Sequence, residues 1–189
     1  MKVFFDTEFT GLHKNTTLIS IGLVDEDGRT FYAEFLGYDS NQVDNWIQEN
    51  VIGHLKYKGC ISNWCNKDIE HFECVGYTYY IRKWLDAWLS KYDEVELVSD
   101  CCHYDMVLFI DIFGGAFDIP KNVNPVCHDI NQDLAKRFMI TEREAFDVSR
   151  EALLKARVDS RIIEGDKHNS LYDAKVIKEL YNIYIAIVN

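Results

Sequence analysis

The sequence lacks any hydrophobic run long enough to cross a membrane. Its longest apolar stretches, at 106–117 and 183–188, are shorter or more interrupted than the ~20 residues that span a bilayer. Near the N-terminus, Asp6 and Glu8 interrupt the apolar start before it reaches the length of a secretory signal core. These absences predict a soluble, cytoplasmic protein.

Positive charge is also scarce. The 20 Lys and Arg residues stand against 31 Asp and Glu residues, which gives a formal net charge of −11. Proteins that hold nucleic acid along a broad surface are normally basic there, so the composition disfavours that class. Divalent cations bound by carboxylates reverse the local field, so a short, local contact with phosphate remains compatible with this charge.

Paired Cys-x2-Cys motifs are missing. The six Cys residues, without a secretory signal, predict free thiols in a reducing compartment. Cys60, Cys65, His71 and Cys74 lie close together, but their spacing does not match the common structural zinc sites. A small zinc protein built on this cluster is an alternative that a zinc assay would test.

Repeats, linkers and low-complexity tails are absent too, and the two Pro residues, Pro120 and Pro125, fall in one loop. The length of 189 residues is close to the prior of roughly 150 residues per domain. We therefore expect residues 1–189 to form a single domain.

What the sequence does contain is a mixture of strand and helix patterns. Strands are predicted at 2–8, 17–25, 29–36, 94–100 and 122–127, and Asp27-Gly28 is a strong hairpin signal between the second and third. Helices are predicted at 43–55, 80–89, 104–113, 130–138 and 170–187, and Gly114-Gly115 ends the third. Residues 58–76 are expected to form a loop or small insertion, and 141–167 a charged, partly helical segment. This order predicts an α/β fold with a mixed sheet and helices on both faces.

Asp6 and Glu8 stand at the carboxyl end of the first strand, where open sheets commonly carry functional groups. Residues two apart in a strand point to the same face, so both carboxylates project together. Like charges this close repel unless a cation or strong donors compensate them. The alternative is a solvated strand end with capping acids.

Two further acids are predicted to lie in helices, and each has a structural alternative. Asp105 lies in an apolar context where a lone carboxylate would be costly, although an acid early in a helix also complements the macrodipole. Asp173 could form a capping box with Ser170, and His168 could be an exposed loop residue.

Taken together, these residues resemble the DEDDh (RNase T/DnaQ-like) family of 3′→5′ exonucleases. Its motifs run Asp-x-Glu after the first strand, Asp in a middle helix, and a last Asp preceded five residues earlier by His. His168 occupies that His position, and Asn169 stands where the other branch of the superfamily has Tyr. The resemblance implies a ribonuclease H-like fold, and the short chain is most similar to small stand-alone bacterial and phage exoribonucleases.

The resemblance also implies a site. Asp6, Glu8, Asp105 and Asp173 would hold two Mg²⁺ or Mn²⁺ ions, and His168 would act as general base. The segment Asp6-Thr7-Glu8-Phe9-Thr10-Gly11-Leu12 is similar to the family's first motif, in which the last apolar residue wedges between bases. Substrate contacts are therefore expected from Phe9, Thr10, Leu12 and Tyr104.

The implied function is metal-dependent hydrolysis from a 3′ end, releasing nucleoside 5′-monophosphates. Single-stranded or 3′-overhanging nucleic acid is the expected partner, with RNA favoured and DNA the alternative, because contacts to the 2′-OH decide between them. A second alternative is a catalytically silent nucleic-acid-binding module, and a homodimer is expected.

Overall fold

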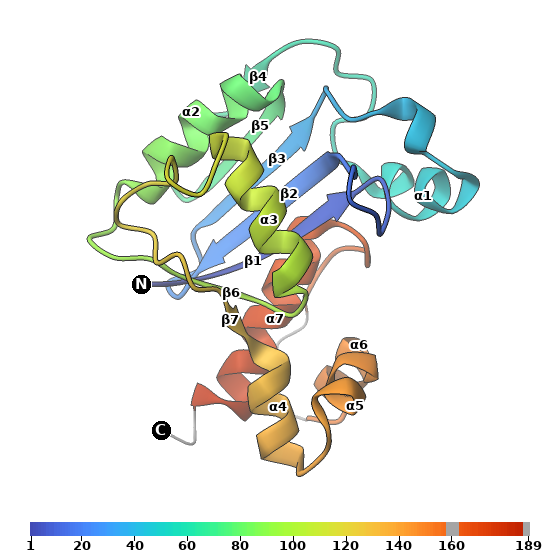
Figure 1. The fold of residues 1–189 in the computed structure, drawn as a ribbon, viewed down its shortest axis with the longest axis vertical. Coiled ribbons are helices and arrows are strands. Elements are labelled where there is room, and N and C mark those ends of the chain that lie inside the picture. Colours follow the sequence, from blue (N-terminus) through green and yellow to red (C-terminus); the bar gives the residue numbers. More distant parts are fainter. Residues whose placement is uncertain (158–162, 187–189) are drawn as a thin grey trace.

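The computed structural model describes residues 1–157 and 163–186 (Figure 1), and a mixed sheet runs through its centre. Seven strands are hydrogen-bonded in the order β4-β5-β3-β2-β1-β6-β7. Their bounds are β1 Lys2–Phe9, β2 Leu18–Asp25, β3 Thr30–Phe35, β4 Trp64–Cys65, β5 His71–Gly76, β6 Glu96–Ser99 and β7 His128–Asp129. The predicted hairpin is confirmed, since β2 pairs antiparallel with both β1 and β3.

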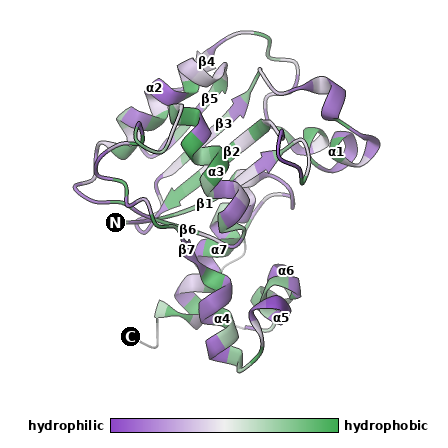
Figure 2. Cartoon of the chain, in the orientation of Figure 1, coloured by the Kyte–Doolittle hydropathy of each residue, from purple (hydrophilic) through white to green (hydrophobic). Residues whose placement is uncertain are grey.

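Helices cover both faces of the sheet (Figure 1), as predicted. They are α1 Asn45–Asn50, α2 Thr78–Leu89, α3 Cys102–Phe113, α4 Ile130–Phe138, α5 Glu142–Asp147, α6 Arg150–Lys155 and α7 Ser170–Tyr184. In β1, Val3 and Phe5 join a core with α2 and α3, whereas Phe4 joins a core with α4 and α7. Figure 2 shows hydrophobic and hydrophilic residues mixed along each helix, as helices with one buried face require. Across the described ranges, no helix has the length and apolarity needed to cross a membrane.

The prediction of a loop or insertion at 58–76 is wrong in its second half. This stretch forms β4 and β5, and β5 pairs parallel with β3. Phe72, Cys74 and Val75 of β5 are buried. A parallel strand is not joined to its partner by a hairpin turn, so no turn motif in the sequence indicates it. Burial on both faces also removes the alternation of apolar and polar residues that marks a half-exposed strand.

The predicted final strand at 122–127 is also misplaced. The last strand is β7, at His128–Asp129, which pairs parallel with β6. Within 122–127, Val123 forms only an isolated bridge with Val95. Pro125 lacks the N–H that a continuing ladder would need, and the polar dipeptide of β7 gives no strand signal.

The remaining helix predictions hold with changed ends. The 43–55 segment is interrupted at Val51, so α1 is followed by a separate 3₁₀ turn at Ile52–His54. Helix α3 ends at Gly114, whose φ of 93° lies in the left-handed region that favours glycine. Helix α7 ends at Tyr184, and the predicted end at residue 187 lies outside the described residues.

Gly22 of β2 sets the position of α7. It pairs with Asp6 of β1 on one side and Tyr32 of β3 on the other. A Cβ at Gly22 would lie 2.3 Å from the Leu171 amide nitrogen, so only glycine lets the start of α7 rest on the sheet. The first turn of α7 therefore lies directly beside Asp6.

Candidate active site

The first two acidic side chains come from β1. Asp6 and Glu8 project toward the α7 side of the sheet together with Phe4, because alternate residues of a strand share a face. Thr7 points to the opposite side, toward α3. The strand thus carries a carboxylate pair on one side and a hydroxyl on the other.

Asp105 comes from the first turn of α3 and is 1 % exposed. Its Oδ1 accepts hydrogen bonds from the Thr7 amide at 3.2 Å and the Thr7 hydroxyl at 2.6 Å. Its Oδ2 accepts from the Ser99 hydroxyl. These donors fix the carboxylate against the end of β1 and meet part of the cost of burying it.

The last two predicted residues are His168, in the turn before α7, and Asp173, in the first turn of α7. Asp173 accepts a hydrogen bond from the His168 amide at 2.9 Å. The predicted capping box with Ser170 does not form, because Asn169 is the N-cap and Ser170 bonds Ser20. His168 lies at a φ of 64°, and its Nδ1 is 4.0 Å from a Glu8 carboxylate oxygen.

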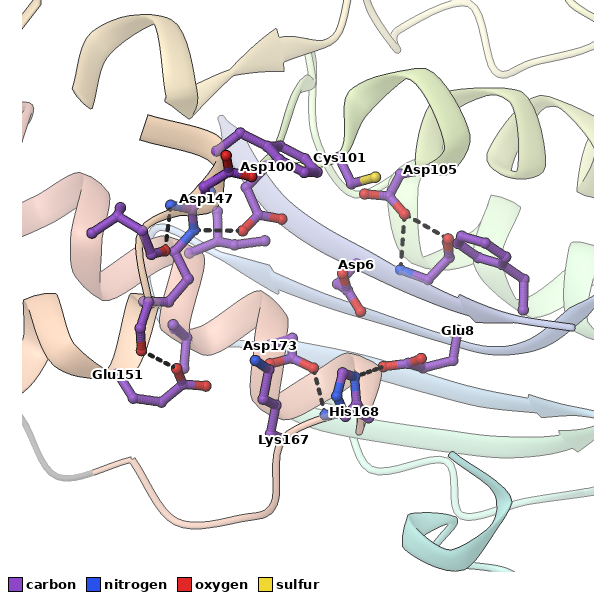
Figure 3. A pocket seen from close by; sticks show the side chains of 18 residues that line it. Asp6, Glu8, Asp100, Cys101, Asp105, Asp147, Glu151, Lys167, His168 and Asp173 are labelled. Atoms are coloured by element: carbon purple, nitrogen blue, oxygen red, sulfur yellow. Dashed lines mark hydrogen bonds and ion pairs between the residues drawn. The ribbon is translucent and has the colours of Figure 1, made fainter. Parts of the chain in front are cut away.

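One cavity of about 460 Å³ brings these side chains together. Figure 3 shows Asp6 between Asp105 on one side and the Glu8, His168 and Asp173 group on the other. All five predicted catalytic residues line this cavity: Asp6, Glu8, Asp105, His168 and Asp173.

The electrostatics of the cavity disfavour bare carboxylates. Burial raises the pKa of Asp6 and of Glu8 well above the usual range, and the Asp105 and Asp173 carboxylates raise it further. Burial also raises the pKa of Asp105 and of Asp173 to about 7. A cation among these groups would restore the charged forms.

The donor set suits a hard divalent cation. Among the described residues, Glu8, His168 and Asp173 form the group whose ligand atoms all lie within 4.8 Å of one another. Carboxylate oxygens are the ligands that Mg²⁺ and Mn²⁺ prefer. This grouping differs from the predicted carboxylate set, since it includes His168 and does not include Asp6 or Asp105. Of the Cys60–Cys74 residues that the structure describes, none enters a group of this kind.

His168 has the opposite shift from the acids. Burial, followed by the electrostatic effect of the neighbouring Lys167 and His54 side chains, lowers the pKa of its imidazole. The ring is therefore neutral at pH 7 and has a nitrogen able to accept a proton. Its edge contacts the Trp46 ring, with centroids 5.1 Å apart.

The predicted substrate-binding residues lie in three different environments. Phe9 lines the cavity and stacks on Tyr104, with ring centroids 5.1 Å apart and planes 14° apart. Leu12 is 76 % exposed. Thr10 is 1 % exposed, and its hydroxyl bonds Thr17 and Gln42, so the structure gives it an internal role in holding the turn after β1.

Several cavity residues were not identified from the sequence. Arg150 donates to the Asp100 carboxylate at 2.8 Å, to Asn131 Oδ1 at 2.5 Å and to the Ala145 carbonyl at 2.7 Å, which ties α5 and α6 to the end of β6. Asp100 follows β6 at its carboxyl end, a position that the strand-end rule could have flagged. Lys167 is next to His168, and no pattern marked it.

Comparison with known proteins gives a family match over almost the whole chain. Residues 1–185 match the family described as the 3′-5′ exoribonuclease Rv2179c-like domain. Two curated relatives from Mycobacterium tuberculosis strains, 3′-5′ exoribonuclease Rv2179c and 3′-5′ exoribonuclease MT2234.1, are each 34% identical over 102 residues. The aligned part is 51% of this chain and 59% of each relative, so the chain spans little more than half the length of the relatives it matches.

Solved structures share the fold at low sequence identity. The nuclease domain of 3′hExo, a DEDDh family member bound to rAMP, superposes with a TM-score of 0.59 at 14% identity, covering 95% of this chain and 88% of that one. A 3′-exonuclease described in 3′-end-specific recognition of histone mRNA stem-loop gives a TM-score of 0.60 at 14% identity, covering 95% and 78%. The predicted ribonuclease H-like α/β architecture is thereby confirmed.

Proposed function

Because the chain belongs to the Rv2179c-like 3′-5′ exoribonuclease domain family, we propose that it hydrolyses phosphodiester bonds from the 3′ end of nucleic acid, with RNA as the favoured substrate. The products are nucleoside 5′-monophosphates. The family match over residues 1–185 also supports a single exonuclease domain. A homodimer is a separate expectation, which light scattering would test.

The observation that carries this proposal is the convergence of four carboxylates and one imidazole in a single cavity. They come from β1, α3, the turn before α7 and the first turn of α7, and the outermost two, Asp6 and Asp173, are more than 160 residues apart in the sequence. Burial and the neighbouring carboxylates raise the pKa values of Asp6 and Glu8, and the Lys167 cation offsets this rise only in part at Glu8. A purely structural role gives no reason to gather them.

Asp6, Glu8, Asp105 and Asp173 would hold two divalent cations, Mg²⁺ or Mn²⁺. Such ions activate water and neutralise charge on the phosphate and the leaving oxygen. Asp6 is the residue that lies between the other groups (Figure 3), and Thr7 and Ser99 orient Asp105 through hydrogen bonds. The acidic cavity therefore accepts phosphate only once cations are bound.

His168 would be the general base. Its pKa is lowered by burial, so the neutral ring is available at pH 7 to take a proton from the attacking water. The Trp46 contact and the half-buried position limit the orientations open to the ring. His168 also stands close enough to Glu8 and Asp173 to be a ligand instead, and the Mg²⁺ affinity of His168→Ala separates these roles.

The stacked Phe9 and Tyr104 rings and the exposed Leu12 would contact the terminal nucleotides. Aromatic faces stack on any base, so they fit a nuclease that removes nucleotides without sequence preference. The printed names of the relatives, which are 3′-5′ exoribonucleases, support RNA over DNA.

The test is a side-by-side digestion of 5′-labelled RNA and DNA oligonucleotides of one sequence, with Mg²⁺, with Mn²⁺ and with EDTA. We expect a ladder that shortens from the 3′ end with either metal, faster on RNA, and no cleavage in EDTA. Asp6→Asn is the matched inactive control. Internal cuts appearing first, or shortening from the 5′ end, would refute the polarity. Metal binding without cleavage of either polymer would support the silent module, and faster cleavage of DNA would reverse the substrate preference.

A further inference from the structure

The side chain of Asn169 connects three parts of the chain. Its Oδ1 accepts hydrogen bonds from the Leu171 and Tyr172 amides, at 3.2 and 3.3 Å, and so caps α7. Its Nδ2 donates to the Tyr32 hydroxyl at 3.3 Å and to the His54 carbonyl at 3.2 Å. All four hydrogen-bonding positions of the amide are thereby used.

Tyr32 is the fixed end of this connection. Its side chain is 1 % exposed, and its hydroxyl donates to Glu34 at 2.8 Å. The same Glu34 oxygen accepts from the Lys56 and Tyr57 amides, at 2.7 and 3.0 Å. The Tyr32 hydroxyl therefore cannot rotate away without breaking bonds on the far side, and it presents its lone pair to Asn169.

The geometry of the sheet explains why this link forms beside the site. Asp6, Gly22 and Tyr32 are directly paired across β1, β2 and β3, so their positions form one row. The start of α7 rests on Gly22, between the two side chains. Tyr32 thus holds the entry to α7 from one side, and Asp6 stands on the other.

His168 immediately precedes Asn169 and depends on this turn for its conformation. Its φ of 64° is unusual for a residue with a side chain, and such conformations persist when the surroundings fix them. Within the turn, the His168 amide donates to Asp173 and the Asn169 amide donates to the Asp166 carbonyl. The Asn169 side chain joins His168's neighbour to Tyr32 of β3, and one residue further on the Ser170 hydroxyl bonds Ser20 of β2.

We propose that Tyr32 and Asn169 are positioning residues, which hold the His168 imidazole at the reacting phosphate through the hydrogen bond between the Tyr32 hydroxyl and the Asn169 amide. The proposal rests on the function proposed above, in which His168 is the general base. Neither residue lines the catalytic cavity, so their effect on the rate is indirect, and the route through His168 is what the double-mutant cycle tests.

Tyr32→Phe removes the hydroxyl and leaves the ring and the α7 cap in place. A ~1 Å misplacement of a catalytic group can cost about 10²-fold in rate, so the loss of one of several restraints should lower kcat by about 10-fold with little change in KM. Asn169→Ser is the second variant, because Ser retains an N-cap oxygen but has no amide donor. It should give a similar loss, and the double variant should be no worse than either single one.

The deciding measurement is a double-mutant cycle with His168→Ala, using single-turnover rates on an RNA oligonucleotide and Mg²⁺ affinity from calorimetry. In the His168→Ala background, Tyr32→Phe should cost nothing further, since the group that it positions is gone. Tyr92→Phe is the matched control, because its buried hydroxyl donates to the buried Asp25 carboxylate at 2.8 Å. It should lower thermal stability without changing kcat.

Three results with the Tyr variants would overturn the proposal. These are an unchanged kcat in folded Tyr32→Phe, an equal loss in the wild-type and His168→Ala backgrounds, and an equal loss of kcat in Tyr92→Phe. Full activity of His168→Ala would also remove it, together with the base assignment. Metal-dependent 3′→5′ cleavage by that variant would still leave the exonuclease assignment standing, so the two failures are distinguishable.

Discussion

Neutralising Asp173 should stabilise the protein when no metal is present. Asp173→Asn keeps the size of the side chain and an oxygen that can accept the His168 amide hydrogen bond. It removes a charge that burial disfavours, as the rise of the Asp173 pKa from 3.8 to about 7 indicates. Function is expected to be lost in the same variant, so stability and activity should move in opposite directions.

The sign and the size follow from linkage. Because the pKa of Asp173 is higher in the folded than in the unfolded protein, its protonated carboxyl stabilises the fold fully below pH 4. This contribution is lost as the pH rises through 7. At about 1.4 kcal/mol per pKa unit, a rise of about 3 units sets a ceiling of about 4 kcal/mol at pH 8. Because the clustered acids titrate together, a neighbour takes up part of this energy, and we expect about 1–3 kcal/mol.

The assay is thermal unfolding in EDTA at pH 8 and pH 5. For a chain of this size, 1–3 kcal/mol corresponds to a Tm about 3–9 °C above wild type at pH 8. The difference should shrink at pH 5, where the wild-type carboxyl gains its proton. Glu49→Gln, an exposed acid on α1, should shift Tm at neither pH.

Added Mg²⁺ supplies a second check on the same variant. It should raise the Tm of the wild type and leave Asp173→Asn nearly unchanged, since binding to the folded state stabilises it. A Tm at or below that of the wild type in EDTA at pH 8 would refute the picture of an uncompensated carboxylate cluster. On going from pH 8 to pH 5, the Tm of the wild type should rise more than the Tm of Asp173→Asn. An equal or smaller rise in the wild type would also refute this picture.

Three other outcomes are expected. His168→Ala should lose about 10²–10⁴-fold in rate, the usual worth of a general base, and calorimetry should show Mg²⁺ affinity close to wild type; a large loss of affinity would instead make His168 a ligand. A 3′-terminal phosphate should block digestion, and equal degradation of blocked and free RNA on a gel would contradict the proposed binding of a 3′-hydroxyl. Gly22→Ala should destabilise the fold by about 1–3 kcal/mol because its Cβ meets the α7 backbone, and an unchanged denaturation midpoint would show that α7 can move aside.

The parts of the fold that sequence patterns predicted are those with local signals. The β2–β3 hairpin follows from Asp27-Gly28 between two apolar runs, and the end of α3 from Gly114. Strand β5 has no such signal, because it reaches β3 through a parallel pairing across 35 intervening residues between Phe35 and His71. That β5 is a strand follows from its pairing with β3, which is too distant in the sequence to be seen in a short segment.

The candidate site could be read from the sequence because its residues have fixed spacing within short motifs. Asp6 and Glu8 share a strand face, and His168 and Asp173 share one turn. The contacts that orient them could not be read in this way. Ser99 bonds Asp105, and Tyr32 bonds Asn169, through side chains whose neighbours become known only from the paired strands and the seating of α7.

Arg150 has a consequence for how freely this chain can vary. Its guanidinium reaches the end of β6, Asn131 of α4 and a carbonyl of α5, so one side chain fastens the outer wall of the cavity to the sheet. Exposed positions of α5 and α6 can therefore drift without moving the wall, as long as this fork of donors persists. Lys at the same position would carry the charge but could not span three acceptors in one plane. Most substitutions in this region should thus be tolerated, whereas substitutions of Arg150 should not.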